Sequence, residues 1–578
     1  MQHYNVSSEQ KANKRREVSS LRVVAAGSLF FLLHRSGFLL YSVSVTFRLF
    51  TAHFVQGLPM EIDPKLIEFL LNPESYPEKP NTITHHETHI SHVFVGDSHV
   101  YKIKKPVKLD FLDFTSLERR RFFCREEVRL NSRLAPDFYL GVSTIYATKN
   151  TYSLLKGAGA ETAEYAVKMR KVPEEKLLHN LIIEGRLIYR ELEPVGLRLA
   201  RFHAEVPEFR GGQHGGLGSV IATTEENHEE IRSFVGKTLD QRLYDDLVEY
   251  TRGFIKQWKD LFAKRVRDGL VREGHGDLHS QHVCLTNPPV IFDCIEFNKR
   301  FRISDILEDI AFLLMDLEFR GRFDLSRNLF KSYFSVQRYA LVSQLLRFYK
   351  IYRAVVRGKI EGIMARSLPD EKEQGRALGR AREYFALADH YMRSDGTHFN
   401  PVVFMGVSGS GKSAIANGLI PDAVLLRSDV VRKESLGQKP DRHSYVEYGT
   451  GMYDEEITRR TYHLLLQRAV EEARGGRRVI VDATYLKEEQ RLAFFGACCA
   501  AGLNPFFVHC FAPERVLRER IQKRLAESTD VSDGHPSILE KQLSIEEEPK
   551  ELPCFRVFAL NTDEDLGTIQ RALRELFL

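Results

Sequence analysis

The chain has 578 residues, enough for several domains, and its 43% hydrophobic and 28% charged residues are ordinary for a globular protein. No fixed-period repeat or long low-complexity tract is present, which argues against repeat architectures. The net charge of +5 lies in residues 1–60, which hold seven Lys/Arg and two Asp/Glu. The rest is neutral overall and offers no electrostatic case for nucleic-acid binding as the main activity.

Seven cysteines are scattered along the chain without a CxxC pair. An odd number of cysteines, several in apolar runs, fits buried thiols in a reducing compartment better than a disulfide framework. The sequence therefore predicts a cytoplasmic protein.

Residues 1–59 form a basic, apolar N-terminal extension. Arg22, Arg35 and Arg48 divide its apolar part into uncharged runs of twelve residues, shorter than the roughly 18 that a membrane helix needs. We therefore predict no integral membrane span. Three interpretations remain: a weak membrane-surface anchor, a targeting peptide, or a segment outside the native protein, with translation starting at Met60. The last is favoured.

Regular patterning begins at residues 63–71, where an Asp cap, a Pro and helically spaced apolar residues predict a helix. Short strands are predicted at 91–95 and 99–103 around Gly-Asp-Ser, a hairpin signal.

The first candidate site lies in residues 272–282, REGHGDLHSQH, before a short apolar strand at 290–292. Phosphoryl transfer needs one acid that deprotonates the acceptor hydroxyl and a second that binds the magnesium bridging the phosphates. Asp277 on the loop and Asp293 past the strand have that arrangement.

The histidines of this loop also invite a zinc interpretation, because zinc uses His and Asp ligands. His275, His279 and His282 have helix-like spacing. The absence of HExxH and the glycine at 276 indicate a loop instead, so zinc is disfavoured.

The HGDLH motif, followed after the short strand by FDCIEF at 292–297, resembles aminoglycoside phosphotransferases and their protein-kinase-like relatives. The resemblance implies a two-lobed domain over residues 60–395, with an N-lobe at about 60–170 and a C-lobe at about 171–395. By this resemblance, the ATP-contacting lysine is Lys102, its ion-pair partner is Glu127, the hinge beside the adenine includes Met169, the catalytic acid is Asp277, and the main magnesium ligand is Asp293.

This half departs from the family pattern in three ways. The family has Asn three residues after the second His as a metal ligand, whereas this chain has His282, and imidazole binds magnesium less readily. Lys104 and Lys105 lie close to Lys102, so the lysine assignment could shift by two. No glycine-rich phosphate loop is evident near 91–96. An inactive kinase-like lobe that regulates its neighbour is therefore the alternative.

A long charged helix at 376–392 and a polar linker at 393–400 precede the strongest motif. GVSGSGKS at 406–413 matches GxxxxGK[ST] between a buried strand, 401–405, and a helical run, 414–419. Backbone N–H groups of such a loop cradle phosphates. The lysine would reach the β- and γ-phosphates, and the final serine would ligate Mg²⁺. The predicted ATP-binding residues are Gly406, Ser408, Gly409, Ser410, Gly411, Lys412 and Ser413.

Beyond the loop, strands and helices alternate. That order predicts a parallel sheet with helices on both faces and ligands at the carboxyl ends of the strands. The predicted strands are 423–426, 479–481, 506–510 and 555–560, and the clearest helices are 455–474 and 487–501.

Polar side chains near these strand ends are the next candidates. Asp482 would hold a magnesium-bound water and Asp429 would accept the acceptor hydroxyl's proton, with helix capping as the plain alternative. Arg520 and Arg524 share a helix face and would form a lid over the transferring phosphate. The alternative is a solvated basic face.

Residues 400–578 resemble the small P-loop kinases related to gluconate kinase, adenylylsulfate kinase and polynucleotide 5′-kinase. The P-loop, Ser-Asp…Arg-Lys at 428–433, Asp-Ala-Thr at 482–484 and the arginine pair carry the resemblance. It implies that Asp429 and Arg432 face the acceptor, whose identity is not inherited.

Together the motifs predict a multidomain α/β and α+β protein, with a protein-kinase-like domain followed by a P-loop NTPase domain at 396–578. The order resembles a bacterial fusion family. We expect a phosphotransferase that uses ATP and Mg²⁺ on a hydroxyl of a small-molecule acceptor, and leave the oligomeric state open. The alternatives are an ATP-binding regulatory protein and a nucleic-acid 5′-end kinase, which the neutral body disfavours.

Overall fold

The computed structural model describes residues 62–109, 112–149, 151–186, 191–211, 214–393, 399–438, 454–527 and 536–577. The predicted extension at 1–59 and most of the predicted linker lie outside these residues. The chain divides into two compact units, one of residues up to Val128 with Phe138–Lys171, the other of Arg129–Asp137 with Val172–Leu578. Among the described residues, no helix is both long and apolar enough to cross a membrane.

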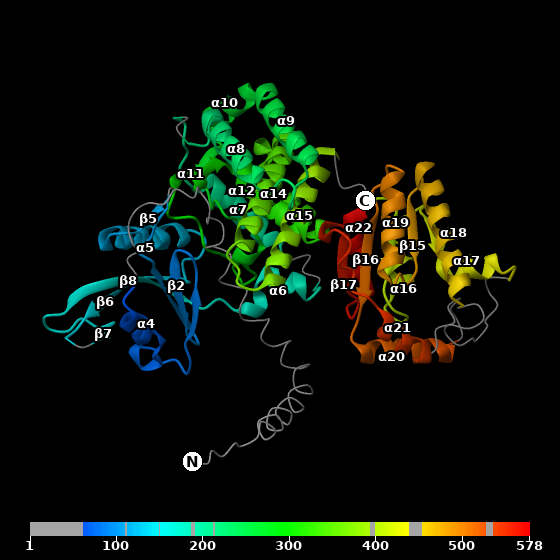
Figure 1. Ribbon diagram of the computed structural model, residues 1–578, viewed down its shortest axis with the longest axis horizontal. Coiled ribbons are helices and arrows are strands. Elements are labelled where there is room, and N and C mark those ends of the chain that lie inside the picture. Colours follow the sequence, from blue (N-terminus) through cyan, green and yellow to red (C-terminus); the bar gives the residue numbers. More distant parts are fainter. Residues whose placement is uncertain are drawn as a thin grey trace, which may run out of the picture. The chain divides into compact units, whose positions relative to one another are not determined.

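The first unit is an antiparallel sheet with two helices (Figure 1). Its elements are α4 (Pro64–Leu71), β1 (Thr84–Glu87), β2 (Ser91–Val95), β3 (His99–Lys104), β4 (Lys108–Leu109), β5 (Leu112–Asp113), α5 (Leu117–Asn131, whose last residues belong to the second unit), β6 (Tyr139–Ala147), β7 (Tyr152–Ser153) and β8 (Glu161–Arg170). The main sheet has the order β1-β2-β3-β8-β6-β7. The predicted hairpin is confirmed, with Val95 opposite Val100.

The helix predicted at 63–71 is also confirmed. The Asp63 carboxylate accepts a hydrogen bond from the Lys65 backbone N–H at 2.9 Å, and Pro64 occupies the first helical position. Leu66 and Leu70 then face the core of this unit.

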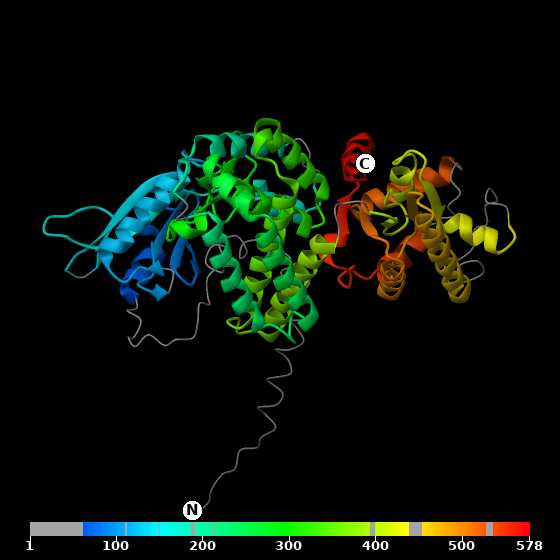
Figure 2. The same cartoon turned by 90° about the horizontal axis from the view of Figure 1, so that it is seen from above.

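The second unit begins with a helical part. Its elements are α6 (Leu178–Ile183), α7 (Glu193–Glu205), α8 (Leu217–Arg232), α9 (Gln241–Gln257), α10 (Lys259–Arg267), β9 (Val271–Glu273), β10 (Val283–Cys284), β11 (Val290–Ile291), α11 (Lys299–Arg302), β12 (Ile303–Asp305), α12 (Ile306–Phe319), α13 (Phe323–Val336), α14 (Ser343–Ala365) and α15 (Glu371–Arg393). α12 is buried over nearly its whole length, and α14 and α15 run side by side (Figure 1 and Figure 2).

Two short antiparallel ladders hold the HGDLH segment in place. β9 pairs with β12, and β10 pairs with β11. The segment 274–282 therefore runs from one ladder to the other, and Asp293 follows the last strand. Ser280–His282 form one turn of 3₁₀ helix, so the glycine-containing segment is a loop, as the sequence predicts.

The C-terminal part of the second unit is a parallel sheet covered by helices. Its elements are β13 (Val402–Met405), α16 (Lys412–Ala416), β14 (Val424–Arg427), α17 (Ser428–Ser435), α18 (Glu455–Arg474), β15 (Val479–Asp482), α19 (Glu488–Ala500), β16 (Phe506–Phe511), α20 (Glu514–Glu527), α21 (Pro536–Ile545), β17 (Val557–Asn561) and α22 (Leu566–Phe577). The order is β14-β15-β13-β16-β17, and all neighbouring pairs are parallel.

Apolar side chains cover both faces of this sheet. One core contains residues of α16 and α22, and the other contains residues of α17, α18 and α19. The predicted sheet with helices on both faces is confirmed. The helical run expected at 414–419 is shorter than predicted, because α16 ends at Ala416 and Gly418 takes a positive φ of 67°.

The helical part contributes to the core of the parallel sheet. Phe323, the first residue of α13, is buried against Phe399 and Phe506, with ring centroids 4.9 and 5.9 Å away. A Cβ at Gly321 would lie 2.0 Å from the carbonyl oxygen of Val557, so the two backbones touch there. The helical part therefore contributes Phe323 to the packed interior of the parallel sheet, where the two parts share a core.

We expect Phe323→Ala to lower the free energy of unfolding by about 3–5 kcal/mol, because the truncation leaves a cavity in this shared core. Urea unfolding followed by circular dichroism would measure the loss. Phe122→Ala, at a side chain that is 57% exposed, is the matched control and should change the midpoint little. Equal, small effects of both substitutions would contradict the shared core.

Candidate active sites

The glycine-rich loop after β13 needs its glycines for close backbone packing. Gly406 has φ of 127°, and a Cβ there would lie 2.2 Å from the carbonyl oxygen of Cys510. Gly409 has φ of 83°, and its Cβ would lie 2.9 Å from the carbonyl oxygen of Leu517. Both positions therefore exclude a side chain. The backbone N–H of Ser408 donates to Gln542 Oε1 at 2.7 Å.

Lys412 lies buried within its own loop. Its Nζ donates to the Val407 carbonyl oxygen at 2.8 Å and lies 3.3 Å from Ser410 Oγ. Burial lowers the pKa of Lys412, against the opposing attraction of Asp482. The ammonium must leave these loop oxygens to reach a bound phosphate.

Ser413 and Asp482 form the oxygen pair expected for magnesium. Burial raises the pKa of Asp482, whereas Lys412, a hydrogen bond from the Ser413 hydroxyl and the Arg427 guanidinium act in the opposite direction. Arg427 Nε lies 3.4 Å from Asp482 Oδ2. Hydroxyl and carboxylate oxygens are the donors that Mg²⁺ prefers, so the chemistry of this pair fits the ion.

Asp429 and Arg432 lie together on α17. Arg432 Nη1 is 3.2 Å from Asp429 Oδ1. Both line a cleft of about 1560 Å³ that is also lined by Lys412, Ser413 and Asp482. The structure therefore brings the predicted phosphate-side and acceptor-side residues to one cleft.

Further residues of α18 line the same cleft, although no sequence motif identified them. Among them are Arg459, Tyr462 and His463. The Tyr462 hydroxyl lies 2.8 Å from Thr484 Oγ1, at the end of β15. The only available signal was their spacing along a predicted helix, which places them on one face.

Both predicted lid arginines, Arg520 and Arg524, line the cleft. The Arg520 guanidinium also donates to Thr562 Oγ1 at 2.9 Å and to the Thr562 carbonyl oxygen at 2.7 Å. The other two arginines of this helix form surface ion pairs with glutamates one turn away, as in the solvated-face interpretation.

The candidate ATP-contacting lysine of the first unit shares its partner with a second lysine. Lys102 Nζ donates to Glu127 Oε1 at 2.9 Å, and Lys104 Nζ donates to Glu127 Oε2 at 2.7 Å. The Lys104 side chain is fully buried, whereas that of Lys102 is 10% exposed. Met169 lies on β8, opposite Val100.

A buried carboxylate holds the HGDLH loop. The backbone N–H of His275 donates to Asp309 Oδ2 at 2.7 Å, and that of Gly276 donates to Asp309 Oδ1 at 2.8 Å. His203 Nε2 lies 3.1 Å from the same carboxylate. Although burial by itself raises the pKa of Asp309, these partners hold it below its usual range.

A second acid of α12 fixes the far end of the loop. The backbone N–H of Ser280 donates to Asp316 Oδ2 at 2.9 Å. Asp309 and Asp316 are seven residues apart in a buried helix, so they lie on one face. That spacing was the one signal for them in the sequence, and no motif marked it.

Asp277 lies between two imidazoles. Burial by itself raises its pKa, but His279 and His282 hold the pKa of Asp277 below its usual range. Burial lowers the pKa of His282 well below its ordinary value, so its ring is neutral. His275 is not part of this group, because its Nε2 donates to the Phe292 carbonyl oxygen at 2.8 Å.

Asp293 has a backbone conformation that non-glycine residues rarely adopt, with φ of 67°. The next residue is anchored, because the backbone N–H of Cys294 donates to Asn131 Oδ1 at 2.8 Å. Strained backbone of this kind concentrates at functional sites. His282 Nε2 lies 3.7 Å from Asp293 Oδ2.

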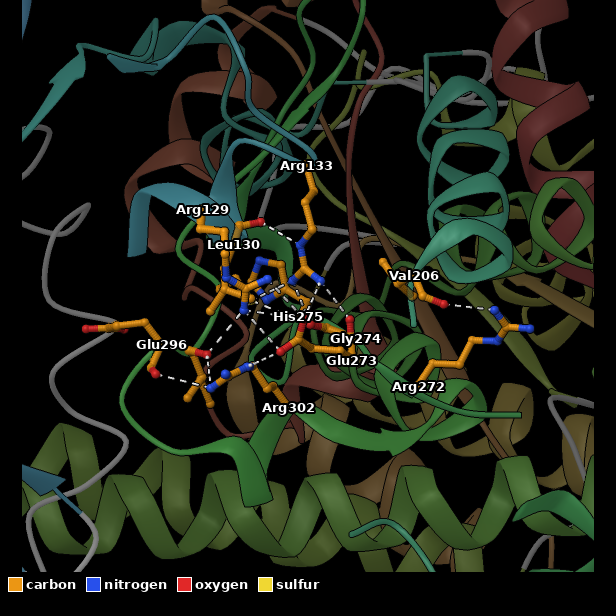
Figure 3. A network of polar contacts seen from close by, with 12 residues as sticks. Arg129, Leu130, Arg133, Val206, Arg272, Glu273, Gly274, His275, Glu296 and Arg302 are labelled. Atoms are coloured by element: carbon orange, nitrogen blue, oxygen red, sulfur yellow. Dashed lines mark hydrogen bonds and ion pairs between the residues drawn. The ribbon is translucent and has the colours of Figure 1, made fainter. Parts of the chain in front are cut away.

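An arginine cluster surrounds the start of the loop (Figure 3). Arg129 Nη2 and Arg302 Nε lie 3.2 and 3.1 Å from Glu273 Oε1. Arg133 donates to the carbonyl oxygens of Glu273, at 3.0 Å, and of Gly274, at 3.2 Å. Buried charges persist when they are paired in this way, and the pairing fixes the backbone just before the HGDLH motif.

Comparisons with known proteins match different lengths of the chain. A protein-family model described as an AAA domain matches residues 402–549. The uncharacterized protein Rv2004c of Mycobacterium tuberculosis (strain ATCC 25618 / H37Rv) is 28% identical over 459 residues, which cover 77% of this chain and 87% of that protein. The uncharacterized protein Mb2027c of Mycobacterium bovis matches to the same extent.

Two solved structures are similar to different parts. A gluconokinase from Sinorhizobium meliloti 1021 is 24% identical, with a TM-score of 0.23, and covers 31% of this chain and 93% of its own. A choline/ethanolamine kinase family protein from Mesorhizobium loti is 13% identical, with a TM-score of 0.34, and covers 57% and 95%. The phosphate loop, the parallel sheet and the family match define a C-terminal P-loop domain, preceded by an antiparallel-sheet unit and a largely helical part. The predicted fold class is confirmed.

We expect Glu127→Gln to lower the free energy of unfolding by about 3–5 kcal/mol at pH 7, because two buried ammonium groups lose their counter-charge. Burial alone would raise the pKa of Glu127, but both lysines hold it at about 2. A depressed carboxyl pKa stabilises the fold above the ordinary value of 4.5, and this contribution is lost as the pH falls toward 2.

The gap between wild type and Glu127→Gln should therefore narrow below about pH 4.5. Urea unfolding at pH 7 and pH 4 checks this. Glu161→Gln, at an exposed position of β8, is the control. A gap that stays constant with pH would contradict the role of the charge.

We expect Gly406→Ala to abolish nucleotide binding, because the new Cβ would collide with the Cys510 carbonyl oxygen and move the phosphate loop. Gly418→Ala is the matched control: its φ is also positive, at 67°, but nothing lies within 4 Å of its Cβ. That variant should cost only about 1 kcal/mol of strain and still bind. Fluorescent ATP-analogue titration measures both, and normal binding by Gly406→Ala would contradict the geometry.

Proposed function

We propose that this chain is an ATP-dependent kinase that transfers the γ-phosphate to a hydroxyl of a small-molecule acceptor at the P-loop domain. One observation carries the proposal: the phosphate loop with Lys412, the Ser413–Asp482 pair and the Asp429–Arg432 pair line a single cleft. A cleft that holds both a phosphate loop and a carboxylate–guanidinium pair is suited to transfer between two bound molecules.

On the phosphate side, the loop backbone and Lys412 bind and orient the β- and γ-phosphates. Lys412 exchanges the Val407 carbonyl oxygen for phosphate oxygen, which restores its charge pairing. Ser413 and Asp482 would hold Mg²⁺, which supplies charge neutralisation across the phosphate oxygens when bound.

On the acceptor side, Asp429 accepts the proton of the attacking hydroxyl. Arg432 orients that carboxylate and is proposed to bind the acceptor. Arg520 and Arg524 line the cleft and stabilise the negative charge of the transferring group. The neutral charge balance outside residues 1–60 favours a small acceptor over a nucleic acid.

We propose the kinase-like half as a second, aminoglycoside phosphotransferase-like site. Lys102 is the better candidate for the phosphate contact, since its side chain retains some exposure and that of Lys104 has none. Glu127 holds that lysine, and Met169 would lie beside the adenine.

In this second site, Asp277 is the proposed catalytic acid, and Asp293 with His282 is the proposed metal site. The alternative is a half that binds without catalysis and regulates the P-loop domain. The imidazole at position 282 favours that alternative, because nitrogen is a poor donor for Mg²⁺. None of the seven cysteines, all of which lie in described residues, forms a disulfide, which supports a reducing, cytoplasmic location.

Radiolabelled ATP transfer to sugars, antibiotics, nucleosides and oligonucleotides tests the proposal. We expect Lys412→Ala to reduce phosphate transfer by about 10²–10³-fold. Removal of one hydrogen-bond donor to the transition state has an effect of this size in other enzymes. Lys550→Ala, at an exposed lysine paired with a neighbouring glutamate, is the control and should leave transfer unchanged.

Asp277→Asn distinguishes phosphate transfer by the kinase-like half from transfer by the P-loop domain. Loss of transfer to a distinct acceptor would support a second active site, and unchanged transfer to every acceptor would favour the regulatory alternative. Absence of labelled product with every acceptor would overturn the kinase proposal, and labelling of oligonucleotide ends alone would replace the small acceptor with a nucleic acid.

A further inference from the structure

The HGDLH loop gathers metal-binding atoms of two kinds in a buried place. Asp277, His279 and His282 each offer one ligand atom, and these atoms all lie within 4.8 Å of one another. Asp293 extends the group, since its Oδ2 lies 3.7 Å from His282 Nε2. The group thus contains two imidazoles and two carboxylates.

The hydrogen bonding of His282 shows which of its two ring nitrogens carries the lone pair. Its Nδ1 lies 2.8 Å from the carbonyl oxygen of Asp277. Because a carbonyl oxygen only accepts, Nδ1 carries the proton and Nε2 is the unprotonated nitrogen. That nitrogen is the atom near Asp293. An imidazole fixed in this way through its other nitrogen is typical of metal ligands.

Two further atoms of the group lack hydrogen-bond partners. Asp277 Oδ1 and His279 Nε2 form no hydrogen bond among the described residues, although His279 Nε2 lies 3.5 Å from Asp277 Oδ2, and both side chains are almost completely buried. Leaving such an atom unsatisfied is unfavourable, so a ligand that takes both of them would be stabilising.

The distances between the ligand atoms suit a small ion with tetrahedral coordination. Ligand bonds of 2.0–2.1 Å in a tetrahedron place neighbouring ligand atoms about 3.4 Å apart. His279 Nε2 lies 3.5 Å from Asp277 Oδ2, and His282 Nε2 lies 3.7 Å from Asp293 Oδ2. Mg²⁺ instead prefers six oxygen donors, which this group does not supply.

We infer that Asp277, His279, His282 and Asp293 bind a borderline divalent transition-metal ion of the zinc class in preference to Mg²⁺. Mixed imidazole and carboxylate ligands select such ions. This goes beyond the proposed function, because the ion binds whether or not this half transfers phosphate. Zinc, disfavoured by motif and spacing alone, is favoured once the loop brings Asp277 to the two imidazoles.

Cobalt(II), a coloured substitute for zinc, is the probe. The full chain, without a histidine tag and freed of metal by a chelator, is titrated with Co²⁺ in the absence of nucleotide and with Mg²⁺ in excess. We expect the intense visible absorption of tetrahedral Co²⁺. Equimolar Zn²⁺ should displace the Co²⁺ and remove this absorption.

The His282→Asn variant replaces the imidazole nitrogen with an amide oxygen donor, as in the aminoglycoside phosphotransferase pattern. We expect it to lose Co²⁺ affinity by more than about 100-fold, since even changes outside the ligand shell cost about 10–100-fold. His279→Gln removes the other nitrogen and should give the same loss, so either variant decides the question if the other fails to fold. Circular dichroism checks folding.

Two controls exclude other sites. His85→Asn changes an imidazole pair between β1 and β2, where His85 Nε2 lies 3.0 Å from His92 Nδ1, and should keep the colour. Asp482→Asn removes the magnesium ligand of the P-loop domain and should also keep it. A colour that survives both loop variants, disappears in either control, or is abolished by excess Mg²⁺ would overturn the inference.

Discussion

The carboxylate of Asp309 is the contact on which the backbone of the HGDLH loop depends. It accepts hydrogen bonds from two successive backbone N–H groups, those of His275 and Gly276, and pairs with His203. These bonds offset the cost of burying a charge and fix the loop where Gly276 takes a positive φ of 84°. Asp316, on the same helix, accepts a hydrogen bond from Ser280 at the other end of the loop. Because α12 holds the loop at both ends, it fixes the path of the backbone and the position of Asp277.

The glycine-rich loop of the P-loop domain is held in place in a different way. Its loop is shaped by glycines that bring backbone against backbone, as Gly406 does against Cys510, rather than by a buried acid. Its charged residues, such as Lys412 and Asp482, instead line the cleft and balance one another. The two loops therefore have unlike supports: a buried acid holds the HGDLH loop, and close backbone packing holds the glycine-rich loop.

Local patterns were sufficient for several elements and for the motifs. The Asp63 cap, the hairpin, the phosphate loop and the parallel sheet follow from short stretches of sequence, because capping, turn formation and βα alternation act between near neighbours. Residues that support the sites from afar had no such signal. Asp309, Asp316 and Tyr462 act across tens of residues or more, and only tertiary packing gives them their partners.

Phe323 has a consequence for how the chain can be divided. Its ring completes the interior of the parallel sheet although it belongs to a helix that precedes that sheet by about 80 residues in sequence. Cleavage between α15 and β13 would leave Phe323 on one fragment and its ring partners Phe399 and Phe506 on the other. Each fragment would expose an apolar surface suited to the other, so the two pieces are expected to reassociate rather than behave as separable modules.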